Sequence, residues 1–213
     1  ILCNGAAGFL DHEQVYKNLL DREQLDAFVQ EAHHEQIDTA FVSLDNIKRS
    51  SSNDVTVMEE AMHSFGAVLP ELDQFFAEEQ EIYQALAFFD QTYDGKFSSY
   101  DKIRFVRWHE NSVDVVPQNG SKAATILHLA EQVGIPHEDI ISFGDGQNDR
   151  EMLRMSGIGI AMGNAVPEVQ AEAKMVTDTN DQDGIWKALK KSHIIVWRGE
   201  YGICTADGDH NTV

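Results

Sequence analysis

The spacing of apolar residues predicts a mixed α+β unit over roughly residues 6–116. Apolar residues recur at helical spacing over residues 21–33, and acidic residues lie early in that segment, as expected of a helix. Residues 39–44 and 83–89 are short, apolar and rich in β-forming side chains, which predicts two strands. Between them, Asp54 precedes a second run of helical spacing, so we expect a helix with Asp54 as its N-cap.

Two further strands, residues 102–108 and 112–116, are predicted to pair through a turn at Glu110 and Asn111. After Pro117 the pattern changes to alternating helices and short apolar strands. This alternation is typical of a parallel sheet covered by helices, that is, a Rossmann-like α/β fold. We expect helices at about residues 121–132, 149–155, from 167 and 185–191, and strands at about 140–143, 157–161 and 175–177.

The formal net charge of −20 narrows the partners that the chain could have. Nucleic acids and anionic membranes need a basic surface to release counterions, so the charge argues against both. An anionic small substrate remains compatible if a metal ion or a local lysine reverses the field inside the site. The apolar runs are too short to span a bilayer. With only Cys3 and Cys204 no disulfide framework is indicated, and we expect a cytoplasmic protein.

The segment from Phe143 to Asp149, with the sequence FGDGQND, carries the strongest chemical signal. Its glycines let the backbone turn sharply at the end of a buried strand, where Asp145, Asn148 and Asp149 are presented together. Oxygen ligands clustered in this way suit Mg²⁺. A structural alternative is that Asn148 caps the next helix and Asp149 favours its positive end, but this leaves Asp145 unexplained.

A second signal is Lys122, which opens a predicted helix after Asn119-Gly120-Ser121. A cation at a helix N-terminus opposes the macrodipole and costs about 0.3–1 kcal/mol. Lys122 could meet a phosphate that the free N–H groups of the helix already attract. Taken alone, an exposed lysine tolerated after a Ser121 cap is the better interpretation.

Together these segments resemble the Cof-type phosphatases of the haloacid dehalogenase superfamily. The resemblance implies a Rossmann-like core, incomplete at its N-terminus here, with an inserted α+β cap domain. It divides the chain into a core strand at 1–5, a cap at 6–116, a catalytic core at 117–192 and an atypical tail at 193–213. It rests on VDVVP (113–117), GSK (120–122), GDGQND (144–149), IAMGNA (160–165), DG (183–184) and the NGA that ends at Ala6.

The family likeness also implies a role for each of these residues. Lys122 would be catalytic, binding phosphate and steadying a nucleophile, and Asn148 and Asn4 would contact the phosphate or the substrate. Asp145 and Asp149 would hold Mg²⁺. In the family an aspartate attacks phosphorus, and water then hydrolyses the aspartyl-phosphate. The substrate would be a small phosphorylated metabolite, either a sugar phosphate or pyridoxal phosphate.

The family's opening Asp-x-Asp-Gly-Thr motif has no counterpart in this chain, and we expect the nucleophilic aspartate upstream of Ile1. Residues 1–213 alone are therefore expected to be inactive. Asp207 and Asp209 in the tail loosely echo that motif, but a foreign or frame-shifted tail is the preferred interpretation.

Two rival functions stay open: a phosphomutase of the same fold, and a catalytically dead remnant or binding protein. Phe88, Phe105 and Trp108 lie at strand positions and are expected in the cap core, although one of them could line the substrate cleft.

Overall fold

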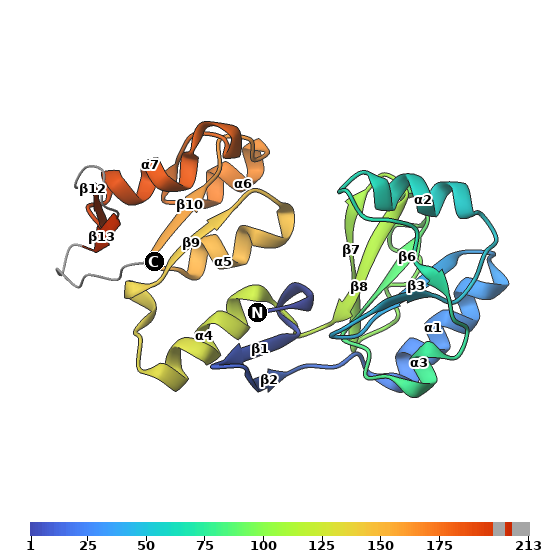
Figure 1. The fold of residues 1–213 in the computed structure, drawn as a ribbon. Helices are drawn as coiled ribbons and strands as arrows, with labels where there is room; N and C mark the ends of the chain where they lie inside the picture. Colours follow the sequence, from blue (N-terminus) through green and yellow to red (C-terminus); the bar gives the residue numbers. More distant parts are fainter. Residues whose placement is uncertain (198–202, 206–213) are drawn as a thin grey trace. The chain divides into compact units, whose positions relative to one another are not determined.

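The computed structural model describes residues 1–197 and 203–205 and contains two compact units, Ile1–Val133 and Gly134–Val213 (Figure 1). None of the described helices combines the length and the apolar composition needed to cross a bilayer. The second unit has the alternating α/β order that the sequence predicts, and the first unit is the α+β part.

A six-stranded sheet forms the centre of the first unit, with strand order β5-β4-β3-β6-β8-β7. Its neighbouring strands are antiparallel except for β4 and β5. A separate antiparallel hairpin is made by β1 and β2. The elements are η1 (Cys3–Gly5), β1 (Ala7–Leu10), β2 (Glu13–Lys17), α1 (Arg22–His34), β3 (Asp38–Val42), β4 (Ile47–Arg49), α2 (Val55–His63), β5 (Glu71–Leu72), α3 (Phe76–Glu79), β6 (Gln84–Phe88), η2 (Gln91–Tyr93), β7 (Ile103–His109), β8 (Ser112–Pro117) and α4 (Lys122–Val133).

Helices α1 and α2 pack against opposite faces of this sheet. Successive side chains of a strand point to opposite faces, so the neighbours Ala40 and Phe41 of β3 belong to different clusters. Phe41 joins Phe28 of α1, and Ala40 joins Met58 of α2. The sheet is therefore buried on both faces over much of its area.

Aspartate side chains cap α1 and α2, which confirms the predicted N-cap at Asp54 and adds one at Asp21. The Asp21 side chain accepts a hydrogen bond from the Gln24 N–H at 3.0 Å, and the Asp54 side chain accepts one from the Val57 N–H at 3.3 Å. Each carboxylate satisfies a backbone donor that the first helical turn leaves unpaired. Local hydrogen bonding thus explains where α1 and α2 begin.

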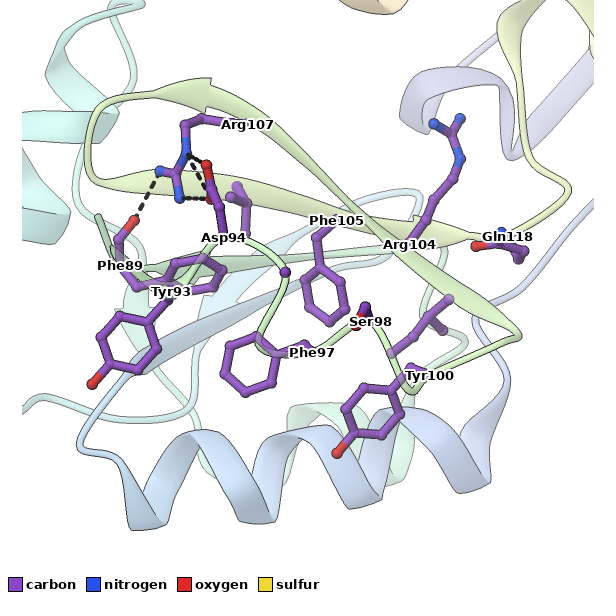
Figure 2. Close-up of a pocket in the computed structure, with 13 residues that line it drawn as sticks. Phe89, Tyr93, Asp94, Phe97, Ser98, Tyr100, Arg104, Phe105, Arg107 and Gln118 are labelled. Atoms are coloured by element: carbon purple, nitrogen blue, oxygen red, sulfur yellow. Dashed lines mark hydrogen bonds and ion pairs between the residues drawn. The ribbon is translucent and has the colours of Figure 1, made fainter. Parts of the chain in front are cut away.

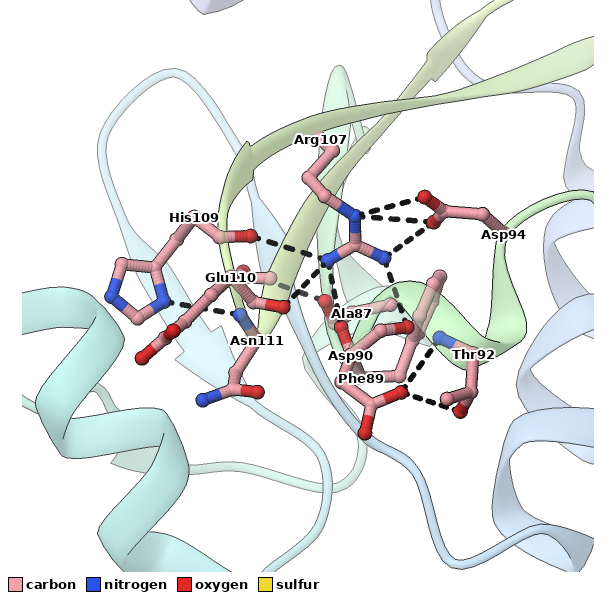
Figure 3. A network of polar contacts seen from close by, with 10 residues as sticks. Ala87, Phe89, Asp90, Thr92, Asp94, Arg107, His109, Glu110 and Asn111 are labelled. Atoms are coloured by element: carbon pink, nitrogen blue, oxygen red, sulfur yellow. Dashed lines mark hydrogen bonds and ion pairs between the residues drawn. The ribbon is translucent and has the colours of Figure 1, made fainter.

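Arg107 ties the β7–β8 hairpin to the segment that follows β6 (Figure 3). Its guanidinium group donates to the carbonyl oxygens of Phe89 at 2.9 Å and Asp90 at 3.0 Å, and to that of His109 at 3.2 Å. Its Nη2 also lies 2.5 Å from Oδ1 of Asp94. Because its donors are used within the fold, Arg107 has a structural role here.

The strand expected at residues 1–5 is wrong, because this segment is a turn. Cys3, Asn4 and Gly5 have φ values of 50°, 52° and 91°, in the left-handed region that a strand never uses. The chain doubles back, and Leu2 forms an isolated antiparallel bridge with Ala7.

The second unit holds the parallel sheet β11-β10-β9, which confirms the Rossmann-like pattern. Asp207 and Asp209 lie outside the described residues. The predicted domain boundaries stay predictions. The elements are η3 (His137–Asp139), β9 (Ile141–Gly144), η4 (Gln147–Asp149), α5 (Arg150–Met155), β10 (Ile158–Ala161), α6 (Pro167–Glu172), β11 (Met175–Val176), η5 (Asn180–Gln182), α7 (Gly184–Lys191) and the antiparallel strands β12 (Ile195–Trp197) and β13 (Ile203–Thr205).

Replacing Phe28 by alanine should destabilise the first unit by about 3–5 kcal/mol, because the ring is fully buried. It packs edge-on against Phe97 at 5.1 Å and Phe105 at 5.0 Å between ring centroids. Urea unfolding followed by circular dichroism measures the loss. The matched control is Phe75→Ala, whose ring is 63% exposed and should matter by less than about 0.5 kcal/mol. Equal losses in both variants would contradict this account of the core.

Candidate active site

The turn after β9 is held together by the carboxylate of Asp149. Its Oδ2 accepts the backbone N–H of Asp145 at 3.0 Å and that of Gly146 at 3.1 Å, and the residue is buried. Asp149 occupies the N-cap position of α5, yet its side chain makes no cap hydrogen bond to that helix. The side chain of Asp149 therefore stabilises the turn that precedes α5.

Two glycines in this turn are required by close contacts. A Cβ atom on Gly144 would lie 2.5 Å from the Cβ of Asp149, and one on Gly146 would lie 2.6 Å from Oδ1 of Asn148. Real Cβ atoms do not approach other atoms this closely, so any larger residue would displace those side chains. The glycines therefore allow Asp145, Asn148 and Asp149 to gather at the carboxyl end of one strand.

Asn164 is a positioning residue that sequence reasoning missed. Its Nδ2 donates to Oδ2 of Asp145 at 3.0 Å, and its Oδ1 accepts the backbone N–H of Asn180 at 3.2 Å. The amide is thus oriented from one side and holds the exposed carboxylate of Asp145 from the other. Its role could have been inferred from its position after β10, in the segment 160–165 that carries part of the family resemblance.

The donor chemistry of this turn fits a hard divalent cation. Asp145, Asn148 and Asp149 offer carboxylate and amide oxygens, which Mg²⁺ prefers and usually supplements with water and substrate phosphate. Over residues 1–197 and 203–205, no three His, Cys, Asp or Glu side chains gather into a preformed metal site. A cation held here would depend on few protein ligands, which is how magnesium is commonly bound.

Lys122 lies in the first unit, at the first turn of α4, next to the turn at Asn4 and Gly5. Ser121 caps the helix, because its Oγ accepts the Ala124 N–H at 2.9 Å. A Cβ on Gly5 would lie 2.7 Å from the carbonyl oxygen of Ser121 and 2.8 Å from the backbone nitrogen of Lys122. Gly5 is therefore needed both for its positive φ and for this close approach.

Asp114 on β8 is a buried carboxyl group that lies in the segment 113–117 of the family resemblance but was given no role by the sequence. Its Oδ2 accepts the Asn4 Nδ2–H at 2.7 Å, and its Oδ1 accepts the Gln84 Nε2–H at 2.8 Å. Burial raises the pKa of Asp114 to about 6, and the donors on Asn4 and Gln84 and the charge of Lys122 offset part of that rise. The Trp108 indole also lowers this pKa, although its N–H is too poorly placed to form a hydrogen bond.

The predicted site residues thus fall into two sets. Asn4 and Lys122 come together in the first unit, where both act on Asp114. Asp145, Asn148 and Asp149 come together in the second unit, at the end of β9. Asn4 also donates to Oε1 of Gln84 at 3.2 Å, so its amide serves this network whatever else it contacts. The catalytic and binding roles assigned to these residues stay predictions.

A cavity of about 380 Å³ in the first unit contains none of these residues (Figure 2). It lies among aromatic side chains between β7 and the segment after β6. Tyr100 at its wall donates a hydrogen bond to Glu31 of α1 at 2.8 Å, and Arg107 pairs with Asp94. Tyr100 and Arg107 are thus engaged in holding the fold, and none of the predicted site residues lines this cavity, so we do not assign it to the active site.

Comparison with known proteins identifies relatives that span most of the chain. A family model described as haloacid dehalogenase-like hydrolase matches residues 1–189. YkrA of Bacillus subtilis, provisionally named a phosphatase, is 35% identical over 188 residues, which make up 88% of this chain and 73% of that protein.

Two further relatives carry more specific names. The structure of the sugar phosphatase BT4131, of HAD subclass IIB, matches with a TM-score of 0.77 and 30% identity, over 89% of this chain and 73% of its own. A shorter match, 38% identical over 84 residues, joins 39% of this chain to 30% of YitU of Bacillus subtilis, which is named a 5-amino-6-(5-phospho-D-ribitylamino)uracil phosphatase.

The stability of the protein should fall as the pH rises through the pKa of Asp114. That pKa is about 6 in the folded chain, against an ordinary value of 3.8, so folding favours the protonated group. The stabilisation is complete below about pH 4 and is lost above about pH 6, and it amounts to ~3 kcal/mol. Urea unfolding of the wild type and of Asp114→Asn between about pH 4.5 and pH 7.5 measures it as a difference. A difference that does not change with pH would show that Asp114 is not buried in this way.

Proposed function

This chain belongs to the haloacid dehalogenase-like hydrolases, in their Cof-type branch, and we propose that it is a Mg²⁺-dependent phosphatase working through an aspartyl-phosphate. Its family and its phosphatase-named relatives make it a phosphoric monoester hydrolase with a phosphorylated small molecule as substrate. The observation that carries the proposal is the turn after β9, where Asn164 holds Asp145 and Asp149 holds the backbone.

In this proposal Asp145 and Asp149 would hold the metal ion. When bound, Mg²⁺ would supply positive charge that neutralises the transferring phosphoryl group. Asn148 would donate hydrogen bonds from its amide to a phosphoryl oxygen. The position of Asp145 at the end of a buried strand supports its role, because a rigid element fixes a ligand more precisely than a free loop.

Lys122 would bind a phosphate oxygen through its ammonium group and steady the nucleophile. The first turn of α4 supports this role, because its backbone N–H groups and its dipole also attract an anion. Asn4 would contact the phosphate or the substrate from the adjoining turn. The nucleophile itself would be an aspartate upstream of Ile1, so catalysis is tested in a protein that includes that segment.

The proposed substrate is a sugar phosphate or a pyridoxal phosphate-like compound. The sugar phosphatase BT4131 supports the first alternative. YitU, which is named for a phosphorylated uracil derivative, supports a substrate with a nitrogen heterocycle, as in the second alternative. The α+β part of the first unit would act as a cap that excludes water from the reaction. We also propose a cytoplasmic location, which the presence of only two cysteines supports.

The alternative function is a phosphomutase of the same fold. A phosphomutase would return phosphate to a sugar, whereas a phosphatase releases it to water, so product analysis separates the two functions.

Replacing Asp145 by asparagine should lower phosphatase turnover at least about 100-fold and raise the Mg²⁺ concentration needed for half-maximal rate. The fold should be unchanged, because the Asp145 side chain is exposed and asparagine keeps its shape. Phosphate release at several Mg²⁺ concentrations measures both effects. Asp139→Asn is the matched control, since Asp139 is exposed and precedes β9 at the other end of the strand. Turnover within a few-fold of wild type in Asp145→Asn would rule out the metal-ligand role.

Lys122→Met should also lower turnover at least about 100-fold while changing the melting temperature by less than about 3 °C. Methionine keeps the aliphatic stem, and two small effects oppose each other. Loss of the charge relieves an unfavourable interaction with the helix dipole but removes a favourable one with Asp114. Lys191→Met, at an exposed position in α7, is the control. A large drop in melting temperature with normal turnover would make Lys122 a structural residue.

A further inference from the structure

A pocket of about 330 Å³ lies on the face of the six-stranded sheet that α2 covers only in part. Such a volume is in the range of small-molecule sites. Strands β3, β4, β6, β7 and β8 contribute side chains to it, and Phe65, just after α2, contributes an aromatic ring. The residues that line it are Val42, Ile47, Phe65, Gln84, Leu86, Trp108 and Asp114.

The polar groups of this pocket are few and lie together. The lining side chains carry three polar groups: the side chains of Gln84 and Asp114, which bond to each other at 2.8 Å, and the indole N–H of Trp108. A sugar presents several hydroxyl groups, and each would lose its hydrogen bonds to water against an apolar wall without regaining partners. The lining therefore disfavours a polyol and favours a mostly apolar ligand with one or two polar atoms.

The aromatic wall favours a planar ring. Phe65 and Trp108 meet edge to face, with ring centroids 5.1 Å apart and an interplanar angle of 83°. Phe65 is 58% exposed, so its ring is held beside the pocket while much of it remains open to contact. Aromatic rings gain most when they meet another ring in an offset or edge-to-face arrangement, which a flat heterocycle can adopt here.

Asp114 determines which polar group a ligand in this pocket should carry. An ionised carboxylate only accepts hydrogen bonds, and each oxygen has two lone pairs. The bonds from Asn4 and Gln84 use one acceptor position on each oxygen, so the group retains acceptor capacity. A ligand in this pocket would therefore offer an N–H or an O–H to Asp114.

The polar end of the pocket leads toward the proposed phosphate-binding residues of the same unit. Asn4 bonds to Asp114 and lies in the turn that approaches Ser121 and the backbone of Lys122. Lys122 is close enough for its charge to act on Asp114. A phosphate near Lys122 and a ring beside Phe65 would thus belong to one elongated ligand.

We propose that this pocket binds a planar nitrogen heterocycle in the substrate, with the ring against Phe65 and Trp108 and a ring N–H or hydroxyl donating to Asp114. This proposal rests on the proposed phosphatase function and narrows its substrate to phosphate esters of heteroaromatic compounds. Phe65 is the specificity-determining residue, because it is the exposed part of the aromatic wall.

The kinetic test compares pyridoxal 5′-phosphate with fructose 6-phosphate in the protein that includes the nucleophile segment. The wild type should prefer pyridoxal 5′-phosphate in kcat/KM, and Phe65→Ala should lower that preference about tenfold, chiefly through KM. Phe65→Tyr keeps the ring and should restore the preference. Phe75→Ala removes a similarly exposed ring outside the pocket and should leave the preference unchanged.

Direct binding separates this inference from the proposed function. The indole N–H signal of Trp108 in a ¹H–¹⁵N NMR spectrum is identified by its absence in Trp108→Phe. It should shift when pyridoxine, which carries no phosphate, is added to the chain of residues 1–213, and it should not shift with fructose. A shift in a protein without activity on any phosphate ester would support the pocket and overturn the phosphatase function. Phosphatase activity without a shift, and with equal losses on both substrates in Phe65→Ala, would overturn the pocket and leave the function standing.

Discussion

A buried carboxylate needs hydrogen-bond partners for its oxygens, and in the first unit this requirement falls on Asp114. The partners it finds, Asn4 and Gln84, come from a turn 110 residues away and from the neighbouring strand β6. Asn4 can reach Asp114 because the backbone at residues 3–5 takes left-handed conformations. The same turn brings Gly5 against the start of α4 and so fixes the surroundings of Lys122. One buried group thereby constrains the turn, the sheet and the helix N-terminus together.

In the second unit, the buried carboxylate of Asp149 finds its hydrogen-bond partners within the six residues 144–149. Asp149 is buried and accepts two backbone N–H groups of the turn that precedes it, so the turn and the carboxylate stabilise each other. Gly144 and Gly146 make room for this arrangement, since side chains there would strike Asp149 and Asn148. Asp145 is left exposed and accepts a hydrogen bond from the side chain of Asn164. Asp149 therefore stabilises the turn through its Oδ2. In the proposed function it would also hold the metal ion, together with the exposed carboxylate of Asp145.

This difference in range explains which features could be predicted from the sequence. Some features depend on contacts between residues close in the sequence, and a short stretch of sequence is enough to predict them. These features are the starts of the helices after Asp21 and Asp54 and the motif at residues 144–149. The hairpin β1–β2 was missed because most of β2 is exposed and lacks apolar alternation. The family resemblance of residues 1–6 predicts a strand where the chain makes a turn, because the left-handed backbone at Asn4 depends on partners far along the chain. Asn164 and Asp114 were missed for the same reason.

The distance in sequence between contacting residues also determines which properties the family resemblance can predict. Asp145, Asn148 and Asp149 lie on one short segment, so a match to that segment is enough to indicate phosphate chemistry. The pocket beside Phe65 and Trp108 is built from side chains up to 72 residues apart, between Val42 and Asp114. No short motif can encode such a wall, and proteins that share the motif can differ in every residue of it. Relatives named for a sugar phosphate and for a uracil derivative are therefore compatible with one reaction. In our proposal, the shape and polarity of the pocket would decide between such substrates.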